Sequence, residues 1–121
     1  MFDTYSLYRL VHLLGIFLLF SALGGATVLA MYGASTGSRV RKLTYILHGV
    51  ALLLVLFGGF GLVAKLAVGW PLWVWLKIVI WLLFGAAVVV IRRAGQRAAL
   101  LLLLLPILGG IAAYLAIYKP F

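Results

Sequence analysis

The chain of 121 residues is 68% hydrophobic and only 9% charged, and its one acidic residue, Asp3, stands against ten lysines and arginines. These values lie outside the range of soluble domains and indicate an integral membrane protein. The lack of cysteine excludes disulfides and thiolate metal sites, and the lack of acids in the apolar runs excludes carboxylate proton relays and paired-carboxylate hydrolysis. The net charge of +9 is expected to face anionic lipid headgroups rather than nucleic acid, because the basic residues lie in short loops and at helix ends.

Four long apolar runs predict an all-α integral membrane protein, an antiparallel bundle of four transmembrane helices. A run of about 18 or more apolar residues is long enough to cross the hydrocarbon core, and a chain of 121 residues holds about four such runs with short turns between them. We therefore expect a single membrane domain that covers residues 1–121. Its predicted spans are residues 7–32, 43–68, 71–91 and 98–118.

The first two predicted spans each carry one histidine and a cluster of small residues. Asp3 and Thr4 precede the first span and are candidate helix caps. His12 lies in the opening turns of the first span and His48 in those of the second. Small residues, which let a neighbouring helix backbone come close, follow in both spans, at Ser21, Ala22, Gly24, Gly25, Ala26, Gly58, Gly59 and Gly61.

The third predicted span is rich in tryptophan and contains a lysine. Pro71 suits the first position of a helix. Trp73 and Trp81 lie four residues before and after Lys77, so they share its helix face and are expected to line a pocket with it. The fourth span contains Pro106, which is expected to kink it, and a further small-residue face at Gly109, Gly110, Ala112 and Ala113.

The distribution of basic residues predicts the orientation in the membrane. The turns between spans 1 and 2 and between spans 3 and 4 hold six lysines and arginines, whereas the opposite side has Arg9, Lys65 and Lys119. Cytoplasmic loops carry an excess of lysine and arginine. Both termini are therefore expected on the non-cytoplasmic side.

His12 is the leading candidate for a functional residue, and Lys77 is its expected partner. An ionisable side chain inside a membrane span is costly and by default marks a functional site. At about 1.5 Å of rise per residue, His12 and Lys77 lie at similar depths, roughly 8 and 9 Å from the non-cytoplasmic surface, whereas His48 lies nearer the cytoplasmic one. His12 and His48 are therefore not expected to be the two axial ligands of one haem. Because no acidic residue is placed to pair with Lys77, an anionic ligand or lipid would balance its charge.

Two arrangements of these residues follow. In the one that we favour, His12 binds the metal of a tetrapyrrole, and Lys77 is either the second ligand or the counter-charge of a propionate. In the other, each histidine serves its own site, which makes His48 a further candidate cofactor-binding residue. The alternative for all three residues is a structural role, since a histidine can hydrogen-bond a neighbouring helix and a lysine can extend to the headgroups.

The chain resembles the SirB family and the related HemJ family of protoporphyrinogen oxidases, small four-helix proteins of the bacterial inner membrane, over nearly its whole length. The resemblance rests on Leu10-Val11-His12, on the stretch from Arg41 to His48 with the leucines and Gly58 that follow, on Trp75-Leu76-Lys77, and on the ending Lys119-Pro120-Phe121. HemJ proteins carry Asn-Glu in the last span ahead of the proline, whereas leucines precede Pro106 here. The resemblance thus implies haem or porphyrin binding at His12 and Lys77 more than it implies oxidase activity.

These observations predict a membrane-embedded protein that binds haem b or another porphyrin near the non-cytoplasmic face of the bacterial inner membrane. Its chemistry would be electron transfer or, if it is an enzyme, porphyrinogen oxidation with electrons passed to quinone or to a partner. The rival interpretation is a non-catalytic accessory subunit of a larger respiratory or photosynthetic complex, packed through its glycine-rich helix faces. The expected partners are the lipid bilayer and the other chains of a homo-oligomer or larger membrane complex. An exporter or channel is disfavoured because the spans contain no acidic residue.

Overall fold

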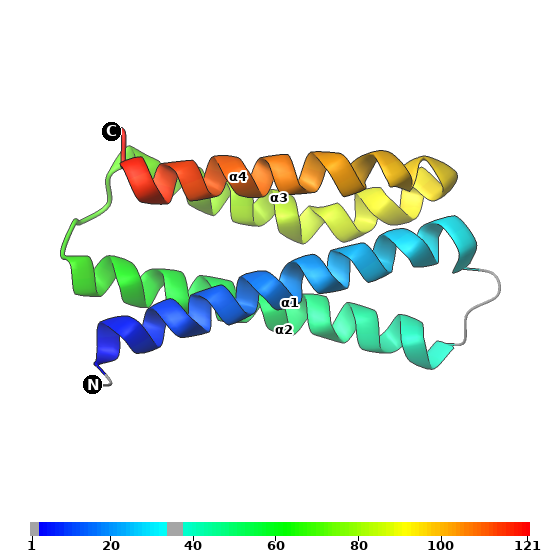
Figure 1. Cartoon of the computed structure of the whole chain (residues 1–121), viewed down its shortest axis with the longest axis horizontal. Helices are drawn as coiled ribbons and strands as arrows, with labels where there is room; N and C mark the ends of the chain where they lie inside the picture. Colours follow the sequence, from blue (N-terminus) through cyan, green and yellow to red (C-terminus); the bar gives the residue numbers. More distant parts are fainter. Residues whose placement is uncertain (1–2, 34–37) are drawn as a thin grey trace.

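The computed structural model describes residues 3–33 and 38–121, which are helical almost throughout (Figure 1). The α-helices are α1 (Thr4–Tyr32), α2 (Ser38–Leu66), α3 (Leu72–Ala94) and α4 (Leu101–Tyr118). A 3₁₀-helix, η2 (Gly95–Leu100), joins α3 to α4. The prediction of an all-helical chain is confirmed. Residues 34–37 of the predicted turn between the first two spans lie outside the described part of the chain.

The sequence predicts four separate spans, whereas helix length and composition in the structure define three. In the described residues three helical stretches are long and apolar enough to cross a membrane: Thr4–Tyr32, Arg39–Leu66 and Leu72–Tyr118. The third stretch has 47 residues because η2, at the predicted turn, is itself helical and leaves no break between α3 and α4, although the chain reverses direction there (Figure 1). Gly95, with φ +56°, ends α3, and the short helix η2 then carries the chain back into α4.

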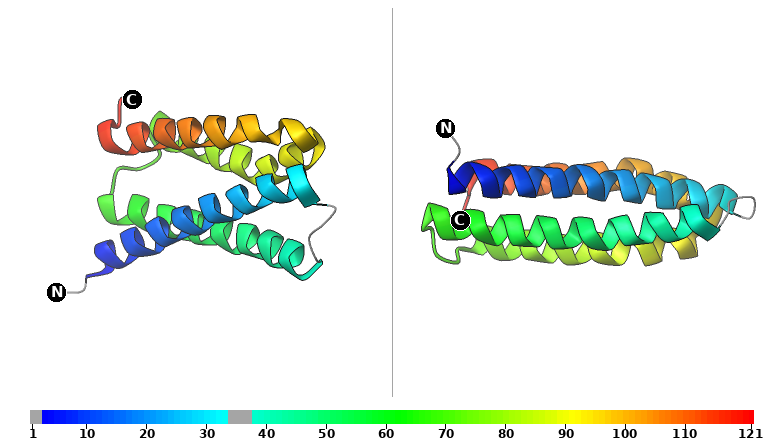
Figure 2. Two further views of the ribbon diagram at one scale, coloured as in Figure 1. Left: turned by 45° about the vertical axis from the view of Figure 1, so that its right-hand side comes forward. Right: turned by 90° about the horizontal axis from the view of Figure 1, so that it is seen from below.

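The helices are arranged as two antiparallel hairpins, α1 with α2 and α3 with α4 (Figures 1 and 2). Both termini and the connection between α2 and α3 lie at one end of the molecule, which we call the terminal end (Figure 1). The end of α1, the start of α2 and η2 lie at the opposite end, which we call the basic end because Arg39, Arg41, Arg92, Arg93 and Arg97 lie there.

Glycines bring α1 and α2 into close contact. A Cβ atom on Gly58 would lie 2.7 Å from the backbone nitrogen of His12, and one on Gly15 would lie 2.8 Å from the backbone nitrogen of Val55. Gly61 packs against the ring of Tyr8 in the same way. Only the absence of a side chain permits these approaches, so the predicted close-packing role of Gly58 and Gly61 is confirmed.

Hydrogen bonds and apolar contacts join the two hairpins. Gln96 of η2 donates its side-chain N–H to the carbonyl oxygen of Met31 at 2.8 Å. Phe20 of α1 packs edge-on against Phe84 of α3, with ring centres 5.3 Å apart. A Cβ on Gly109 of α4 would lie 2.7 Å from the tip of the Phe20 ring, so this glycine makes room for the aromatic pair. The interface therefore holds one continuous core to which all four helices contribute.

Two of the predicted helix starts are refined by the structure. Asp3 is the N-cap of α1 and accepts a 2.6 Å hydrogen bond from the backbone N–H of Ser6, so its predicted role is confirmed, whereas Thr4 is the first helical residue. Pro71 is the N-cap of α3 rather than its first helical residue. Its fixed φ of −70° still sets the chain direction into the helix.

Candidate functional site

A cavity of about 620 Å³ lies between the two hairpins on the side of the terminal end. All four helices line it, from Tyr5 and Lys119 near the termini to Phe84 near the middle of α3. Its walls are mostly apolar and aromatic, with a few polar side chains among them. Its volume falls within the range of about 300–1,000 Å³ that is usual for small-molecule and cofactor sites. We call it the central cavity.

His12 lies in the wall of the central cavity, and one of its ring nitrogens is fixed. The Nδ1–H of His12 donates a 2.8 Å hydrogen bond to the carbonyl oxygen of Val55 on α2. A carbonyl oxygen can only accept, so Nδ1 carries the proton and Nε2 has the lone pair of a neutral imidazole. No described residue bonds Nε2. Histidines that ligate metals in proteins have this arrangement, with the second ring nitrogen bonded to a carbonyl or carboxylate.

Lys77 lines the same cavity, flanked by two tryptophans. Trp73 and Trp81 both contribute to the wall, as the spacing around Lys77 predicts. Trp73 is buried, and the indole N–H of Trp81 donates to the carbonyl oxygen of Leu52 at 3.0 Å, which fixes its ring. Within the described part of the chain Lys77 has no hydrogen bond or ion pair. The structure thus brings His12 and Lys77 together around one space.

His48 is placed elsewhere. It is buried, with 6% of its surface exposed, and its Nε2–H donates to the carbonyl oxygen of Phe84 at 3.0 Å. It does not line the central cavity. This position, nearer the basic end, agrees with the predicted difference in depth between the two histidines. The geometry of His48 is that of a side chain that links α2 to α3.

Two cations of the central cavity were not predicted as site residues. Arg9 lies three residues before His12 and so shares its helix face, and Lys119 lies at the terminal end because the last helix returns there. The Nζ of Lys119 donates to the carbonyl oxygen of Ala116 at 2.7 Å and lies 5.5 Å from the ring centre of Trp73. The position of Arg9 could have been predicted from the sequence, because its spacing from His12 is helical. The contact of Lys119 with Trp73 could not, because it depends on the packing of α3 against α4.

The charge of the central cavity is positive. Arg9, Lys77 and Lys119 line it together with His12, and none of its lining residues is acidic. Within residues 3–33 and 38–121, moreover, no group of three or more histidine, cysteine or acidic side chains is placed to hold a metal ion by itself. The site can offer one imidazole nitrogen to a metal and several cations to an anion. A ligand suited to it is largely apolar, bears anionic groups and brings the other ligands of any metal with it.

Comparison with models of protein families, with curated proteins and with solved structures finds no match to this chain. The resemblance to the SirB and HemJ families therefore stays a prediction that rests on the motifs named above.

Proposed function

We propose that this protein binds haem b or another porphyrin in the central cavity. The observation that carries the proposal is the hydrogen bond from His12 Nδ1 to the carbonyl oxygen of Val55, because it presents Nε2 as the free donor atom in a cavity that Lys77 shares. A porphyrin has the required chemistry, since its macrocycle is flat and apolar, its propionates are anionic, and it supplies four nitrogen ligands to its metal.

Five residues of the cavity wall have a part in this proposal. His12 would hold the metal through Nε2, and the Val55 carbonyl would keep the imidazole in its present orientation. Lys77 would pair with a propionate, because an ammonium group half-buried among apolar side chains is stabilised by an anion. Trp73 and Trp81 would pack against the macrocycle. Bound haem would supply one-electron chemistry.

The proposal includes four membrane crossings and termini outside the cytoplasm of a bacterial cell. A straight helix of 47 residues would be about 70 Å long, more than twice the hydrocarbon core of about 30 Å. The stretch Leu72–Tyr118 instead folds back at η2, so that α3 and α4 lie antiparallel, each long enough for one crossing (Figure 1). The excess of arginine at the basic end favours a cytoplasmic location for that end.

Absorption spectroscopy of the purified protein tests the proposal. The full chain, expressed with haem supplied and purified in detergent, should show a Soret band with stoichiometric haem. His12→Ala should abolish this band, whereas His48→Ala should keep it in the fraction that remains folded. Equal haem content in the wild type and in folded His12→Ala protein would refute ligation by His12.

The second candidate function is that of an accessory subunit in a larger membrane complex. The observation that favours it is the presence of glycines with no atom within 4 Å of a Cβ built on them, such as Gly49 on α2 and Gly110 on α4, which leave helix faces open to another helix. Other glycines are used within the chain, since Gly15, Gly58 and Gly109 pack against its own residues. Purification under mild detergent separates the two functions. A porphyrin-binding protein should carry its pigment when isolated as a single chain type, whereas an accessory subunit should co-purify with larger chains.

A further inference from the structure

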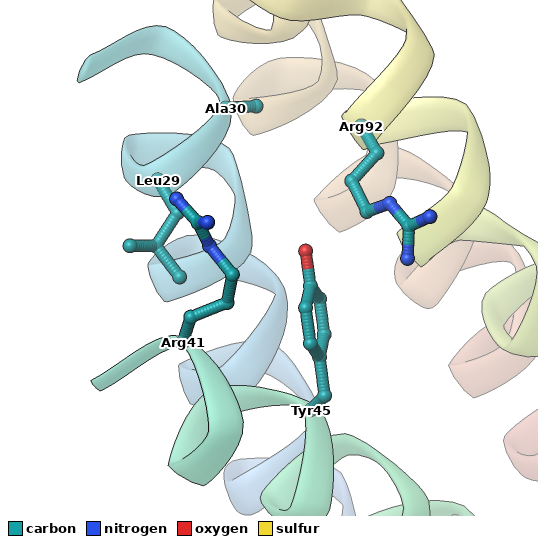
Figure 3. Close-up of a pocket in the computed structure, with 5 residues that line it drawn as sticks. All are labelled: Leu29, Ala30, Arg41, Tyr45 and Arg92. Carbon is teal, nitrogen blue, oxygen red and sulfur yellow. The ribbon is translucent and has the colours of Figure 1, made fainter. Parts of the chain in front are cut away.

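A second, smaller cavity of about 340 Å³ lies at the basic end of the molecule (Figure 3). Arg41 and Tyr45 of α2, Arg92 of α3, and Leu29 and Ala30 of α1 line it. It shares no lining residue with the central cavity. We call it the arginine pocket.

Two helices, α2 and α3, carry the polar groups of the arginine pocket. Arg41 and Tyr45 are one helical turn apart on α2, and the Tyr45 side chain rises between the two arginine side chains (Figure 3). The guanidinium carbon of Arg92 lies 5.7 Å from the centre of the Tyr45 ring, within cation–π range. One terminal nitrogen of Arg41 donates to the carbonyl oxygen of Gly33 at 2.9 Å. The two guanidinium groups therefore lie on either side of one phenol, Arg41 with one hydrogen bond to Gly33 and Arg92 beside the ring.

The side chains of Arg41, Tyr45 and Arg92 have hydrogen-bond donors that no residue of the described chain uses. A guanidinium group carries five N–H donors, and the Gly33 carbonyl accepts from a single nitrogen of Arg41. Among the described residues nothing hydrogen-bonds the Tyr45 hydroxyl or forms an ion pair with Arg92. Two cations and a hydroxyl thus line a space that no described acceptor fills.

The charge around the arginine pocket is not balanced by the chain itself. The only acidic side chain is that of Asp3, which caps α1 at the opposite end of the molecule. The neighbouring charged residues Arg39, Lys42 and Arg93 are all basic. Both arginines are exposed, so an anion from outside the chain can reach them without displacing a carboxylate of the chain itself.

We propose that Arg41, Tyr45 and Arg92 bind a phosphate group. Guanidinium groups match phosphate oxygens through paired N–H donors, and a phenol hydroxyl adds one further donor to the same anion. Leu29 and Ala30 give the pocket an apolar wall beside its charged one, which suits a phosphate that carries an acyl glycerol. Basic pockets between helices at a cytoplasmic surface bind lipid headgroups in this way. The phosphate is that of an anionic phospholipid or inorganic phosphate, and the experiment separates the two sources.

The test is native mass spectrometry of the full chain purified in detergent with equal amounts of phosphatidylglycerol and phosphatidylcholine. The wild type should retain phosphatidylglycerol in preference. The double variant Arg41→Gln/Arg92→Gln should retain at least about tenfold less, since it removes two charge-assisted contacts. Tyr45→Phe should retain about two- to fivefold less, as expected for one neutral donor.

The chain offers a matched control in Arg39→Gln/Arg93→Gln. This variant removes the same charge from the same two helices at the same end, but neither residue lines the arginine pocket. It should retain nearly the wild-type amount of phosphatidylglycerol. Equal losses in the two double variants would overturn the proposal, because they would assign binding to general surface charge. Arg41→Lys/Arg92→Lys, which keeps the charge, should still bind more weakly than the wild type if paired N–H donors matter.

Thermal unfolding separates the two sources of phosphate. With phosphatidylglycerol as the ligand, this lipid raises the unfolding temperature of the wild type but not of Arg41→Gln/Arg92→Gln, and inorganic phosphate at matched ionic strength has no effect. The reverse pattern assigns the pocket to inorganic phosphate. If both ligands act equally on the wild type and the double variant, the pocket binds neither and the proposal fails.

Discussion

The imidazole of His12 on α1 is hydrogen-bonded at 2.8 Å to the carbonyl oxygen of Val55, a residue 43 positions later on α2. Three residues beyond Val55, Gly58 lies directly against the backbone of His12, where its Cβ would be 2.8 Å from the His12 Cα. The same turn of α2 therefore sets the distance between the two helices and the orientation of the ring. The orientation of His12, the candidate metal ligand, therefore depends on a glycine that has no side chain.

Gly58→Ala is expected to destabilise the fold and to disturb His12. The new methyl group would contact the backbone of His12, which cannot rotate away, so the helices must separate, at a cost of about 1–3 kcal/mol in the free energy of unfolding. Gly49→Ala on the same helix is the matched control, because nothing lies within 4 Å of its Cβ. It should leave stability unchanged or raise it by about 0.5–1 kcal/mol. Detergent-denaturation curves measure both, and equal costs would contradict the packing described.

Lys77→Met is expected to weaken binding of a porphyrin that has free propionates while sparing its dimethyl ester. Methionine keeps the length and apolar stem of the side chain but removes the charge. Loss of one charge-assisted contact should raise the dissociation constant of the free acid about tenfold or more. Fluorescence quenching during titration of the two porphyrins measures the difference. Equal weakening for acid and ester would mean that Lys77 only shapes the cavity.

The parts of this fold that follow from local pattern could be predicted from the sequence. Long apolar runs predict the helices, and helical spacing places Trp73, Lys77 and Trp81 on one face. The antiparallel order of the predicted spans places His12 and Lys77 at a similar depth in the membrane. The structure places both residues in the wall of one cavity. These inferences need only the rise per residue and the order of the segments.

The parts that depend on contacts between helices could not be predicted. The sequence does not reveal that His48 bonds the carbonyl of Phe84 or that Lys119 meets Trp73, since both contacts are set by the rotation of one helix against another. Nor does it reveal that η2 stays helical, because a glycine followed by polar residues is equally typical of an open turn. The arginine pocket was missed for a related reason. Its two arginines lie on different helices, and their convergence on Tyr45 depends on the packing of α2 against α3.

His48→Leu is expected to lower stability without removing a bound porphyrin. The variant loses a buried hydrogen bond between α2 and α3, at a cost of about 1–3 kcal/mol. Gln96→Ala removes a similar bond from an exposed side chain, the one to Met31, and should cost less than about 1 kcal/mol because water and headgroups replace it. Unfolding curves and pigment content of the folded fraction measure the two effects. Loss of pigment from folded His48→Leu protein would show that His48 does hold a cofactor.

The first turn of α1 is expected to weaken at low pH through Asp3. The hydrogen bonds from the backbone amide and hydroxyl of Ser6 lower the pKa of the Asp3 carboxyl, and the charge of Lys65 adds to this. In the unfolded chain the carboxyl titrates near its ordinary pKa of about 4. The stabilisation is therefore fully present above about pH 4 and is lost as the pH falls through the lower folded-state pKa.

An NMR titration of the Asp3 carboxyl carbon checks this shift. The midpoint should lie below that of a short peptide with the same sequence. Ser6→Ala should bring the two midpoints closer, although not together, because the backbone amide still donates. A midpoint at or above that of the peptide would contradict the capping geometry.

The orientation in the membrane is tested by labelling with a membrane-impermeant thiol reagent. The chain contains no cysteine, so a single introduced cysteine is the only reactive site. Arg39→Cys and Arg97→Cys, near the two connections at the basic end, should react only from the cytoplasmic side, since the local excess of arginine favours retention there. Lys65→Cys, exposed near the end of α2, should react only from outside. Labelling of Arg39→Cys and Arg97→Cys from opposite sides would rule out the return of the chain between α3 and α4, and labelling of both from outside would invert the orientation.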